Sequence, residues 1–422
     1  MGDAVPLNDS TAVVDTVADV QARYVATPES TEQAAAVLRM ATERGLKVVP
    51  RGTATKLEWG KPPDRVDILL DTSRLVGIVD HAAGDLVVRV RAGTPMSRLA
   101  GTLFPKRQRL SLSTRLPVQD GYVGGTVGGT IAANPSSQLR YGFGTIRDLL
   151  IGVTVVLADG TIAHAGGGVV KNVAGYDLGK LLVGSLGTLG VVTEAVFRLH
   201  PAPSATRLVT VEVDQGEIAG WLAAALRRAQ LAPSAVEVDA WNDGAVTVGV
   251  LVEGVPNGVV ARSEAAARIL GRDAEITVVE GPSELPDWWL SPATDAAGTS
   301  LRIAVPPSVA GPMVDIVRAT SARAGVTVTC RGSLGAGVLH AGLSGEYDVE
   351  PVAALVEELR ELAAKHEGTV LVESAARDVH RALGKRGTDA FGPIPALPLM
   401  ERLKHEFDPD RVLAPGRFAG AI

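Results

Sequence analysis

The sequence contains one cysteine, Cys330, among its 422 residues. A single thiol forms no intrachain disulfide, and it cannot supply the ligands of an iron–sulfur cluster or of a cysteine-based zinc site. We expect no metal site in this chain. Such sparing use of cysteine is typical of a reducing compartment, and it predicts a cytoplasmic protein.

Aromatic residues and membrane signals are also scarce. Aromatics make up 4% of the chain, too few for the stacking platforms of proteins that bind single-stranded nucleic acid. The formal net charge of -6 gives no overall attraction to nucleic acid, so no nucleic-acid partner is expected. The N-terminus lacks a basic segment followed by an apolar run, and the longest apolar stretches, such as 149–158, are too short to span a bilayer. Neither a secretory signal nor a transmembrane segment is expected.

The common nucleotide-binding fingerprints are missing as well. No G-x-G-x-x-G motif opens a helix after a strand with an acidic residue about 20 positions later. The stretch 175–181 only half resembles a Walker loop, because its spacing is one residue short and Leu181 replaces Ser or Thr. These absences exclude the most familiar ways of binding a nucleotide.

Glycine is plentiful, with 47 residues, and it is densest between Gly121 and Gly190. Three glycine-rich segments stand out, at 50–56, 124–130 and 184–191. Glycine lets backbone N–H groups approach a phosphate or a planar ring, and Thr and Ser hydroxyls add donors. Flexible surface loops are the alternative, but the glycines alternate with strongly apolar, strand-like runs. The pattern therefore predicts a phosphate-containing ligand.

Local signals place these loops between helices and strands. Ser30 and Gln33 form a potential capping box at the start of a helix that ends at Gly45. Thr94-Pro95 predicts a second helix start, with Thr94 as N-cap and proline in the first turn. Strands are expected at 46–50, 86–92, 151–157 and 191–199, with a hairpin turn at 159–160.

Residues 207–373 contain a pattern that occurs twice. Each half reads strand, helix, strand, strand, helix, strand, which is the ferredoxin-like βαββαβ arrangement. Two such halves can share one antiparallel sheet with the helices on one face. The first half has strands at 207–213, 235–240, 245–253 and 275–279 and helices at 216–230 and 259–270; the second has strands at 301–305, 326–330, 338–343 and 369–373 and helices at 308–324 and 351–366.

These elements predict an α+β protein in three parts. Residues 1–203 would form a two-part α/β ligand-binding domain, ending at the linker that contains Pro201 and Pro203. Residues 204–375 would form a ferredoxin-like cap domain. The segment 376–422 is too short for a domain, and its helix at 397–406 is expected to pack back on the first domain.

A series of motifs runs through the glycine-rich region in a fixed order and continues at the C-terminus. The series resembles the FAD-binding domain of the vanillyl-alcohol-oxidase (PCMH-type) family, over residues 20–202 and 397–418. The string 171–178 and the terminal motifs resemble the branch that includes the E subunit of bacterial glycolate oxidase. The segments are 128–134, 140–142, 146–149, 156–160, 171–178 and 184–192, with Asp408-Pro409 and Pro415-Gly416-Arg417.

The resemblance implies FAD and gives each glycine-rich loop a role. Family members with covalent flavin use a His in the first loop, and this loop has neither His nor Cys, so FAD is expected to be non-covalent. The implied cofactor residues are Arg51, Gly52, Thr53, Ala54 and Thr55 at the pyrophosphate, Val127, Gly128, Gly129, Thr130 and Ala133 along the flavin and its ribityl chain, and Gly187, Thr188, Gly190 and Val192 at the adenosine or the ring carbonyls.

Candidates for catalysis are fewer. His340 is a possible base for the hydroxyl proton of a 2-hydroxy acid, although a lone strand histidine satisfied by a neighbour is the more common situation. Arg331 and Arg302 are candidates to anchor a carboxylate, against the simpler interpretation that both are solvent-facing strand-end residues. Lys171 and Asn172 lie in a polar run that suits a structural turn as well as a substrate contact.

The sequence therefore predicts an FAD-dependent oxidoreductase subunit that takes part in oxidising a small 2-hydroxy acid such as glycolate. Since one cysteine gives the electrons no on-chain exit through an iron–sulfur cluster, they would pass to a partner. The resemblance implies a second flavoprotein subunit and an iron–sulfur subunit, which could hold the chain at the inner face of a membrane. Two alternatives stay open: a non-catalytic flavin-carrying relay or structural subunit, and a stand-alone FAD dehydrogenase for another alcohol or sugar.

Overall fold

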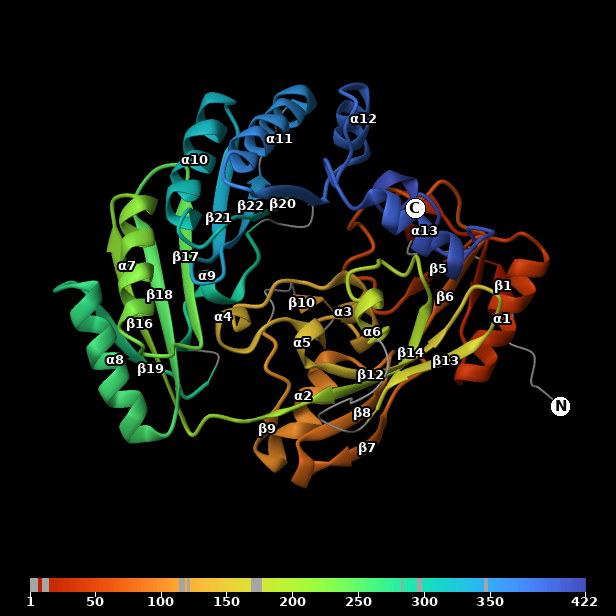
Figure 1. The fold of residues 1–422 in the computed structure, drawn as a ribbon, viewed down its shortest axis with the longest axis horizontal. Helices are drawn as coiled ribbons and strands as arrows, with labels where there is room; N and C mark the ends of the chain where they lie inside the picture. Colours follow the sequence, from red (N-terminus) through yellow and green to blue (C-terminus); the bar gives the residue numbers. More distant parts are fainter. Residues whose placement is uncertain are drawn as a thin grey trace.

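The computed structural model of this chain describes residues 7–9, 15–113, 118–119, 122–167, 177–281, 284–293, 298–344 and 348–422. Two sheets from the N-terminal half lie beside one large sheet built from strands between residues 205 and 374 (Figure 1). The α+β class expected from the sequence is confirmed.

The first N-terminal sheet is mixed, with the strand order β1-β4-β6-β5. Its central strand β6 runs parallel to both β4 and β5. Helix α1 begins after Ser30, whose side chain accepts a hydrogen bond from Gln33 N at 3.2 Å. The expected capping box is only half formed, because Gln33 Oε1 accepts from Glu29 N instead of Ser30 N. The elements are β1 (Leu7–Asp9), β4 (Tyr24–Ala26), α1 (Thr31–Glu43), β5 (Val48–Arg51) and β6 (Ile68–Asp71).

The second N-terminal sheet is antiparallel, with the order β13-β12-β14-β8-β7. The alternation expected in β8 is confirmed: Val88 and Val90 are buried, whereas Arg89 and Arg91 are exposed. The turn around Asp159-Gly160 joins β12 to β13, as expected. The strands are β7 (Ile78–Ala82), β8 (Val87–Arg91), β12 (Leu150–Val156), β13 (Ile162–Gly166) and β14 (Val191–Arg198).

Short helices and strands connect these sheets. The expected start of α2 is wrong by one residue, since Pro95 is the N-cap. Thr94 does not cap the helix, because its Oγ1 accepts from Gly77 N at 2.9 Å. The connecting elements are β2 (Thr16–Val17), β3 (Val20–Gln21), α2 (Met96–Leu103), β9 (Gln108–Arg109), β10 (Val118–Gln119), β11 (Tyr122–Val123), α3 (Val127–Ala133), α4 (Arg140–Phe143), α5 (Ile146–Leu149), α6 (Gly179–Leu182) and β15 (His200–Pro201).

The large sheet is fully antiparallel and contains both expected βαββαβ halves. Its order is β19-β16-β18-β17-β21-β22-β20-β23, so the halves join where β17 pairs with β21. The elements are β16 (Ala205–Val213), α7 (Gly216–Arg228), β17 (Ala235–Trp241), β18 (Val246–Gly254), α8 (Pro256–Leu270), β19 (Glu275–Val278), α9 (Asp287–Leu290), β20 (Thr299–Ala304), α10 (Ala310–Arg323), β21 (Thr327–Ser333), β22 (Val338–Ser344), α11 (Val349–Ala364) and β23 (Thr369–Ser374).

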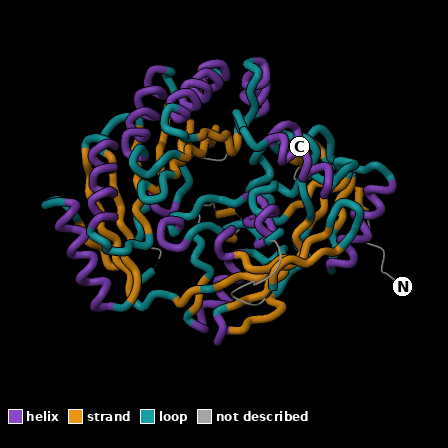
Figure 2. The backbone as a smooth tube through the Cα atoms, viewed as in Figure 1, coloured by secondary structure: helices purple, strands orange, loops and turns teal. Residues whose placement is uncertain are grey.

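The helices α7, α8, α10 and α11 cover the outer face of this sheet, and the N-terminal half lies toward its inner face (Figure 2). α7 packs on α10 where Gly220 meets Gly311. A Cβ added to Gly311 would lie 2.6 Å from Gly220 Cα, so the two helices approach too closely for side chains. The outer face carries the apolar side chains that pack under the helices. The inner face can therefore carry the polar side chains of the sheet.

The C-terminal segment divides between the two parts. α12 (Arg377–Lys385) packs on α11, and its Val379 and Leu383 belong to the core of the large sheet. α13 (Leu397–Phe407) leads instead to the first N-terminal sheet, where Val48 and Leu413 form a parallel bridge. Only the part of the segment from α13 onward therefore lies on the N-terminal sheets, and the C-terminus ends near β5 (Figure 1).

Candidate functional site

A row of charged side chains crosses the inner face of the large sheet. The register places Asp239 opposite Arg331, Arg331 opposite His340, and His340 opposite Arg302. Residues paired directly across neighbouring strands point to the same face of the sheet, so these four side chains lie side by side on that face. The alternate positions, such as Leu339 and Ile303, are buried under the helices.

Arg331 belongs to a closed ion pair within this row. Its Nε lies 2.6 Å from Asp239 Oδ1, and its Nη1 donates to the carbonyls of Ser291 and Pro292. Both partners of the pair are nearly buried. The interpretation of Arg331 as solvent-facing is wrong, and its engaged guanidinium is poorly suited to the alternative role of substrate anchor.

His340 and Glu373 form a second polar pair on the same face. His340 Nδ1 lies 3.1 Å from Glu373 Oε2, and the carboxylate is buried. Glu373 occupies a register shift between β20 and β23, an irregularity that often re-aims a side chain beside a functional site. Burial raises the pKa of Glu373, but His340, Arg302 and Lys56 together hold it below its usual value. The carboxylate therefore stays ionised and accepts the hydrogen on Nδ1, which orients the imidazole ring.

Arg302 lies beside this pair but is only loosely held. Its Nε is 3.6 Å from Glu373 Oε1, and its Nη1 donates to the Asn134 carbonyl at 3.4 Å. The contact with Asn134 shows that Arg302 points toward the glycine-rich half of the chain. Arg302 is thus neither a strand-end nor a fully exposed residue, as the simpler interpretation assumed.

The first glycine-rich loop is tied to the same strand that carries Glu373. Gly60 N donates to the Glu373 carbonyl at 3.0 Å, and Trp59 forms an isolated antiparallel β-bridge with Ser374. The Lys56 amine lies 5.5 Å from the centre of the Trp59 ring. Burial lowers the pKa of Lys56 to about 8, although the negative charge of Glu373 opposes this shift.

A narrow cavity of about 70 Å³ separates this loop from α3. A Cβ on Gly52 would lie 2.2 Å from Thr126 Oγ1, so only glycine lets the loop pass so close. Thr126 in turn caps α3 by accepting from Gly129 N. The lining residues are Pro50, Gly52, Thr53, Ala54, Thr55, Lys56, Leu57, Thr126, Gly129, Ala132, Ala133, Leu186 and Arg417.

Several residues expected at the cofactor have other contacts. The Arg51 guanidinium binds Asp15 at 2.9 Å and Asp71 at 2.7 Å, so its side chain is held by two carboxylates. Gly128 packs on Ala92, and Val127 is buried in the core of the second sheet. In the third loop, Gly187 packs on Pro50, Gly190 packs on Val155, the Thr188 hydroxyl donates to the Ser185 carbonyl, and Val192 lies in the core.

A second cavity of about 530 Å³ lies on the other side of α3. Apolar side chains of α2 line it, together with Leu110 and Leu112, and it reaches Gly124 and Thr130. Two buried polar atoms near α3, Asn134 Oδ1 and Arg417 Nε, have no hydrogen-bond partner among the described residues. Space on both sides of α3 and unsatisfied polar atoms fit an extended ligand with hydrogen-bonding groups.

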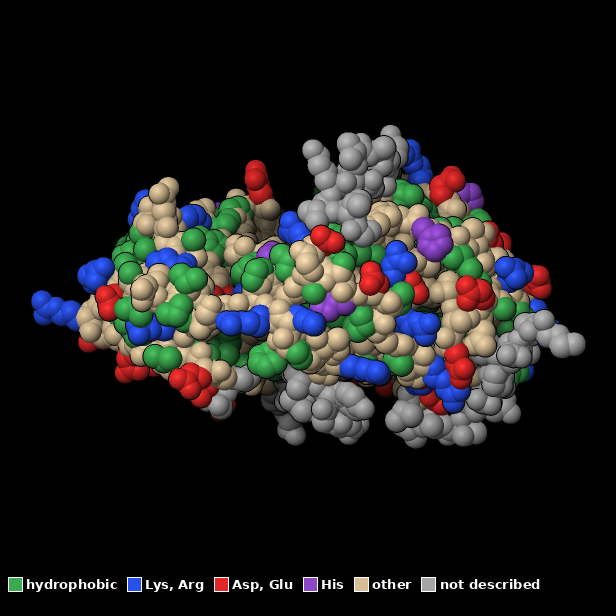
Figure 3. Space-filling model, turned by 90° about the horizontal axis from the view of Figure 1, so that it is seen from below, with side chains coloured by type: hydrophobic (Ala, Val, Ile, Leu, Met, Phe, Trp, Pro, Cys, Tyr) green, Lys and Arg blue, Asp and Glu red, His purple; other side chains and the backbone are tan. Residues whose placement is uncertain are grey.

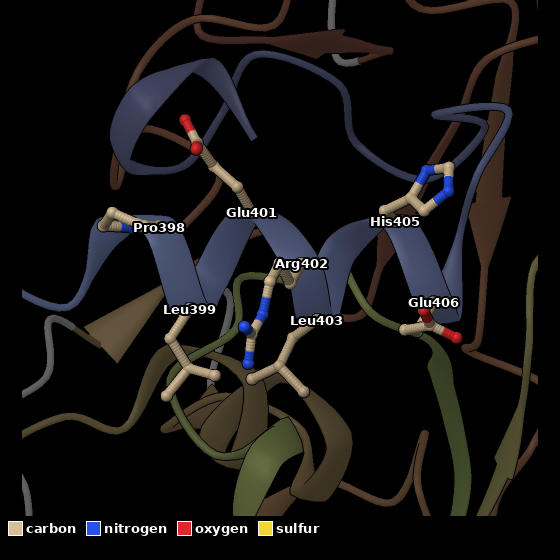
Figure 4. A pocket seen from close by; sticks show the side chains of 7 residues that line it. All are labelled: Pro398, Leu399, Glu401, Arg402, Leu403, His405 and Glu406. Carbon is tan, nitrogen blue, oxygen red and sulfur yellow. The ribbon is translucent and has the colours of Figure 1, made fainter.

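A further pocket of about 550 Å³ lies along α13, and no residue of the glycine-rich loops lines it (Figure 4). Leu399, Arg402 and Leu403 project from one side of the helix, and Glu401 and His405 from the other. None of the expected site residues lines it. Lys171 and Asn172 lie outside the described residues.

Comparison with known proteins connects this geometry to a family. Residues 22–166 match the model described as "FAD binding domain", and residues 293–418 match "FAD linked oxidases, C-terminal domain". In fold, the chain is similar to p-cresol methylhydroxylase, with a TM-score of 0.72 at 16% identity, over 95% of this chain and 89% of that one. The chain is a PCMH-type, FAD-dependent oxidoreductase. The expected family and the FAD cofactor are confirmed.

Individual relatives of this flavoprotein differ in how much they share with it. Glycolate oxidase subunit GlcD of Bacillus subtilis is 26% identical over 93% of this chain and 88% of its own length. Glycolate oxidase subunit GlcE of Escherichia coli is 33% identical over 41% of this chain and 49% of its own length. D-lactate dehydrogenase of Archaeoglobus fulgidus is 37% identical over 42% of this chain and 38% of its own length. The chain thus spans less than half of the last two.

The structure of the flavoprotein also shows residues that sequence reasoning missed. Lys56 is the last residue of the first glycine-rich segment but was given no role, Arg417 lies in the terminal Pro-Gly-Arg motif, and Glu373 ends a predicted strand. Only Arg417 had a signal, since its motif was part of the resemblance. Within the described ranges, no three His, Cys, Asp or Glu side chains converge as metal ligands, and no helix has the length and apolarity needed to cross a membrane.

Figure 3 shows the lower surface, where acidic and basic side chains are interspersed.

Proposed function

We propose that this flavoprotein oxidises a small 2-hydroxy acid, with His340 as the base. The observation that carries the proposal is the His340–Glu373 pair, flanked by Arg302 on the sheet face that looks toward the glycine-rich loops. A 2-hydroxy acid needs a base for its hydroxyl proton and a cation for its carboxylate, and these three residues supply both. The glycolate oxidase and D-lactate dehydrogenase relatives support this substrate class.

Each residue has a defined part in the proposed reaction. Arg302 binds the substrate carboxylate and thereby fixes the carbon that bears the hydroxyl. His340 Nε2 accepts the hydroxyl proton, while Glu373 holds the ring and stabilises the imidazolium that results. FAD, when bound, supplies the acceptor for the hydride that leaves this carbon.

The cavity beside the first loop would hold part of the FAD through residues 52–56 and Gly129, with Ala133 as a wall. The side chain of Arg51 would contribute only by fixing the loop. Because no His or Cys lines this cavity, we propose that FAD is bound non-covalently. Acid precipitation of the protein should leave the flavin in the supernatant, and a yellow pellet would contradict this.

The deciding experiment is anaerobic mixing of the FAD-loaded protein with glycolate, D-lactate and larger 2-hydroxy acids. A catalytic chain bleaches its flavin absorbance without partners. His340→Asn should slow bleaching by roughly 10²- to 10⁴-fold, the usual contribution of a general base. His164→Asn is a matched control, because His164 lies exposed on β13. A flavin that stays oxidised with every acid, yet accepts electrons from a partner, would support the relay subunit instead.

We propose further that electrons leave through partner chains in a reducing compartment such as the cytoplasm. The one cysteine, Cys330, is buried in the large sheet and cannot ligate a cluster. The glycolate oxidase subunits among the relatives support a multi-subunit enzyme, and an iron–sulfur subunit is the suitable one-electron acceptor. Dye-linked turnover by the lone chain should be much slower than by the co-expressed subunits; equal rates would exclude a need for partners.

A further inference from the structure

The ammonium group of Lys56 lies among the glycine-rich loops, and its positive charge has no part in the proposed reaction. Lys56 lines the cavity between the first loop and α3. Its Nζ lies 5.5 Å from the centre of the Trp59 ring and 3.9 Å from the point that a Cβ on Gly125 would occupy. The ammonium is therefore placed where the first and second glycine-rich loops meet.

The protein leaves the donors of this ammonium unused. An ammonium has three N–H donors, but within the part of the chain that the structure describes Lys56 Nζ has no hydrogen-bond or ion-pair partner. The side chain is half-buried, and burial lowers its pKa to about 8, against the opposing charge of Glu373. Below that pKa the amine stays protonated. A partly desolvated cation with free donors suits a ligand that carries negative charge at this point.

Both walls of the cavity are bonded to residues of the proposed substrate site. On the loop side, Gly60 N donates to the Glu373 carbonyl at 3.0 Å. On the other side, the Asn134 carbonyl at the end of α3 accepts from Arg302 at 3.4 Å. Hydride transfer requires the donor carbon and its acceptor to be in contact. The end of the cavity beside these bonds is therefore where a flavin must lie to react with a substrate at His340.

We propose that Lys56 contacts the flavin ring and stabilises the negative charge that reduction brings to it. In the proposed reaction the hydroxyl proton goes to His340, while the hydride carries two electrons and a negative charge from the substrate carbon to the flavin. A fixed cation beside the ring stabilises the reduced cofactor more than the oxidised one, so Lys56 would raise the two-electron midpoint potential. This inference rests on the proposed function for the position of the reacting end.

The midpoint potential tests the inference without substrate, by anaerobic equilibration of the FAD-loaded protein with redox dyes of known potential. Lys56→Met removes the charge and keeps most of the side-chain length. Reduced flavin should then bind roughly 10- to 100-fold more weakly relative to oxidised flavin, the usual effect of losing one charge-assisted contact. For a two-electron couple this ratio lowers the potential by about 30–60 mV. Lys56→Gln should behave similarly, and Lys56→Arg, which keeps the charge, should restore most of the potential.

Lys61→Met is the matched control, because Lys61 follows in the same chain segment but does not line the cavity. It should keep the wild-type potential. A contact with the FAD phosphates is the competing role for Lys56. It would weaken the binding of oxidised FAD and of ADP and leave the potential unchanged. That result would overturn the inference, as would a folded Lys56→Met protein that retains no FAD.

Flavin reduction by glycolate, D-lactate and larger 2-hydroxy acids is followed in parallel, so that this inference and the proposed function can fail separately. A potential that depends on Lys56, in a protein that no 2-hydroxy acid reduces, would contradict the proposed reaction and leave the flavin contact standing. Reduction by a 2-hydroxy acid with equal potentials in wild type and Lys56→Met would keep the reaction and refute the contact.

Discussion

Lys404 offers a sharp test of how the C-terminal segment holds the third glycine-rich loop. Its ammonium is 1% exposed and donates to Asp408 Oδ2 at 2.7 Å, the Thr188 carbonyl at 2.8 Å and the Leu413 carbonyl at 2.8 Å. Asp408 is fully buried and accepts from the backbone N–H groups of Val412 and Leu413. This network joins α13, the segment 412–413 that bridges β5, and the third loop.

Lys404→Met keeps most of the side-chain volume but leaves the Asp408 charge and two carbonyls buried without their donor. Removing one partner of a buried ion pair typically costs about 3–5 kcal/mol. The free energy of unfolding should fall by this amount in the transition of the N-terminal half, measured by urea titration with circular dichroism. Flavin should also be released at lower urea, because the Thr188 loop loses its anchor.

Two further variants make this test decisive. Arg402→Met changes an exposed cation of the same helix (Figure 4), and it should alter the free energy of unfolding by less than about 0.5 kcal/mol. Lys404→Met combined with Asp408→Asn removes the unpaired charge, so it should be more stable than Lys404→Met alone. If Lys404→Met costs less than about 1 kcal/mol, the buried pair does not hold the loop and the reasoning fails.

Other residues give shorter tests. Gly129→Val should keep the fold but lose FAD, measured as flavin per protein, because a Cβ there meets only Thr126 Oγ1, at 3.1 Å, and would project into the cavity; normal flavin content would place the cofactor elsewhere. Without FAD, the free energy of unfolding of the wild-type chain should rise relative to that of Lys56→Met, by on the order of 2 kcal/mol, as pH increases from about 8 to about 10.5. The reason is that the unfolded chain keeps the Lys56 proton in this range, whereas the folded chain releases it. Urea midpoints that change equally with pH in both proteins would contradict this. Arg331→Met should destabilise the protein by about 3–5 kcal/mol, because it leaves Asp239 unpaired. It should not change the substrate affinity of the molecules that fold. A raised KM would indicate that Arg331 does bind the substrate.

The sequence alone determined the secondary structure of the large sheet with little error. Both βαββαβ halves were expected within a few residues of their observed bounds, because strands such as β18 and helices such as α11 carry long, regular apolar patterns. The glycine-rich loops stood out for a related reason, since glycines such as Gly52 are required by contacts that leave no room for a Cβ. Short signals were less secure: Thr94 has the residue type of an N-cap, but its hydroxyl binds a neighbouring loop.

The tertiary structure decided which charged residues act together. Arg331 and Arg302 are equally plausible anchors in the sequence, but the register places Asp239 against Arg331 and leaves Arg302 beside His340. Lys56 and Glu373 lie far apart in the chain and carry no pattern that predicts their meeting. Their proximity follows from how the glycine-rich half docks on the large sheet, and no local propensity encodes that docking, since it depends on the summed packing of both halves.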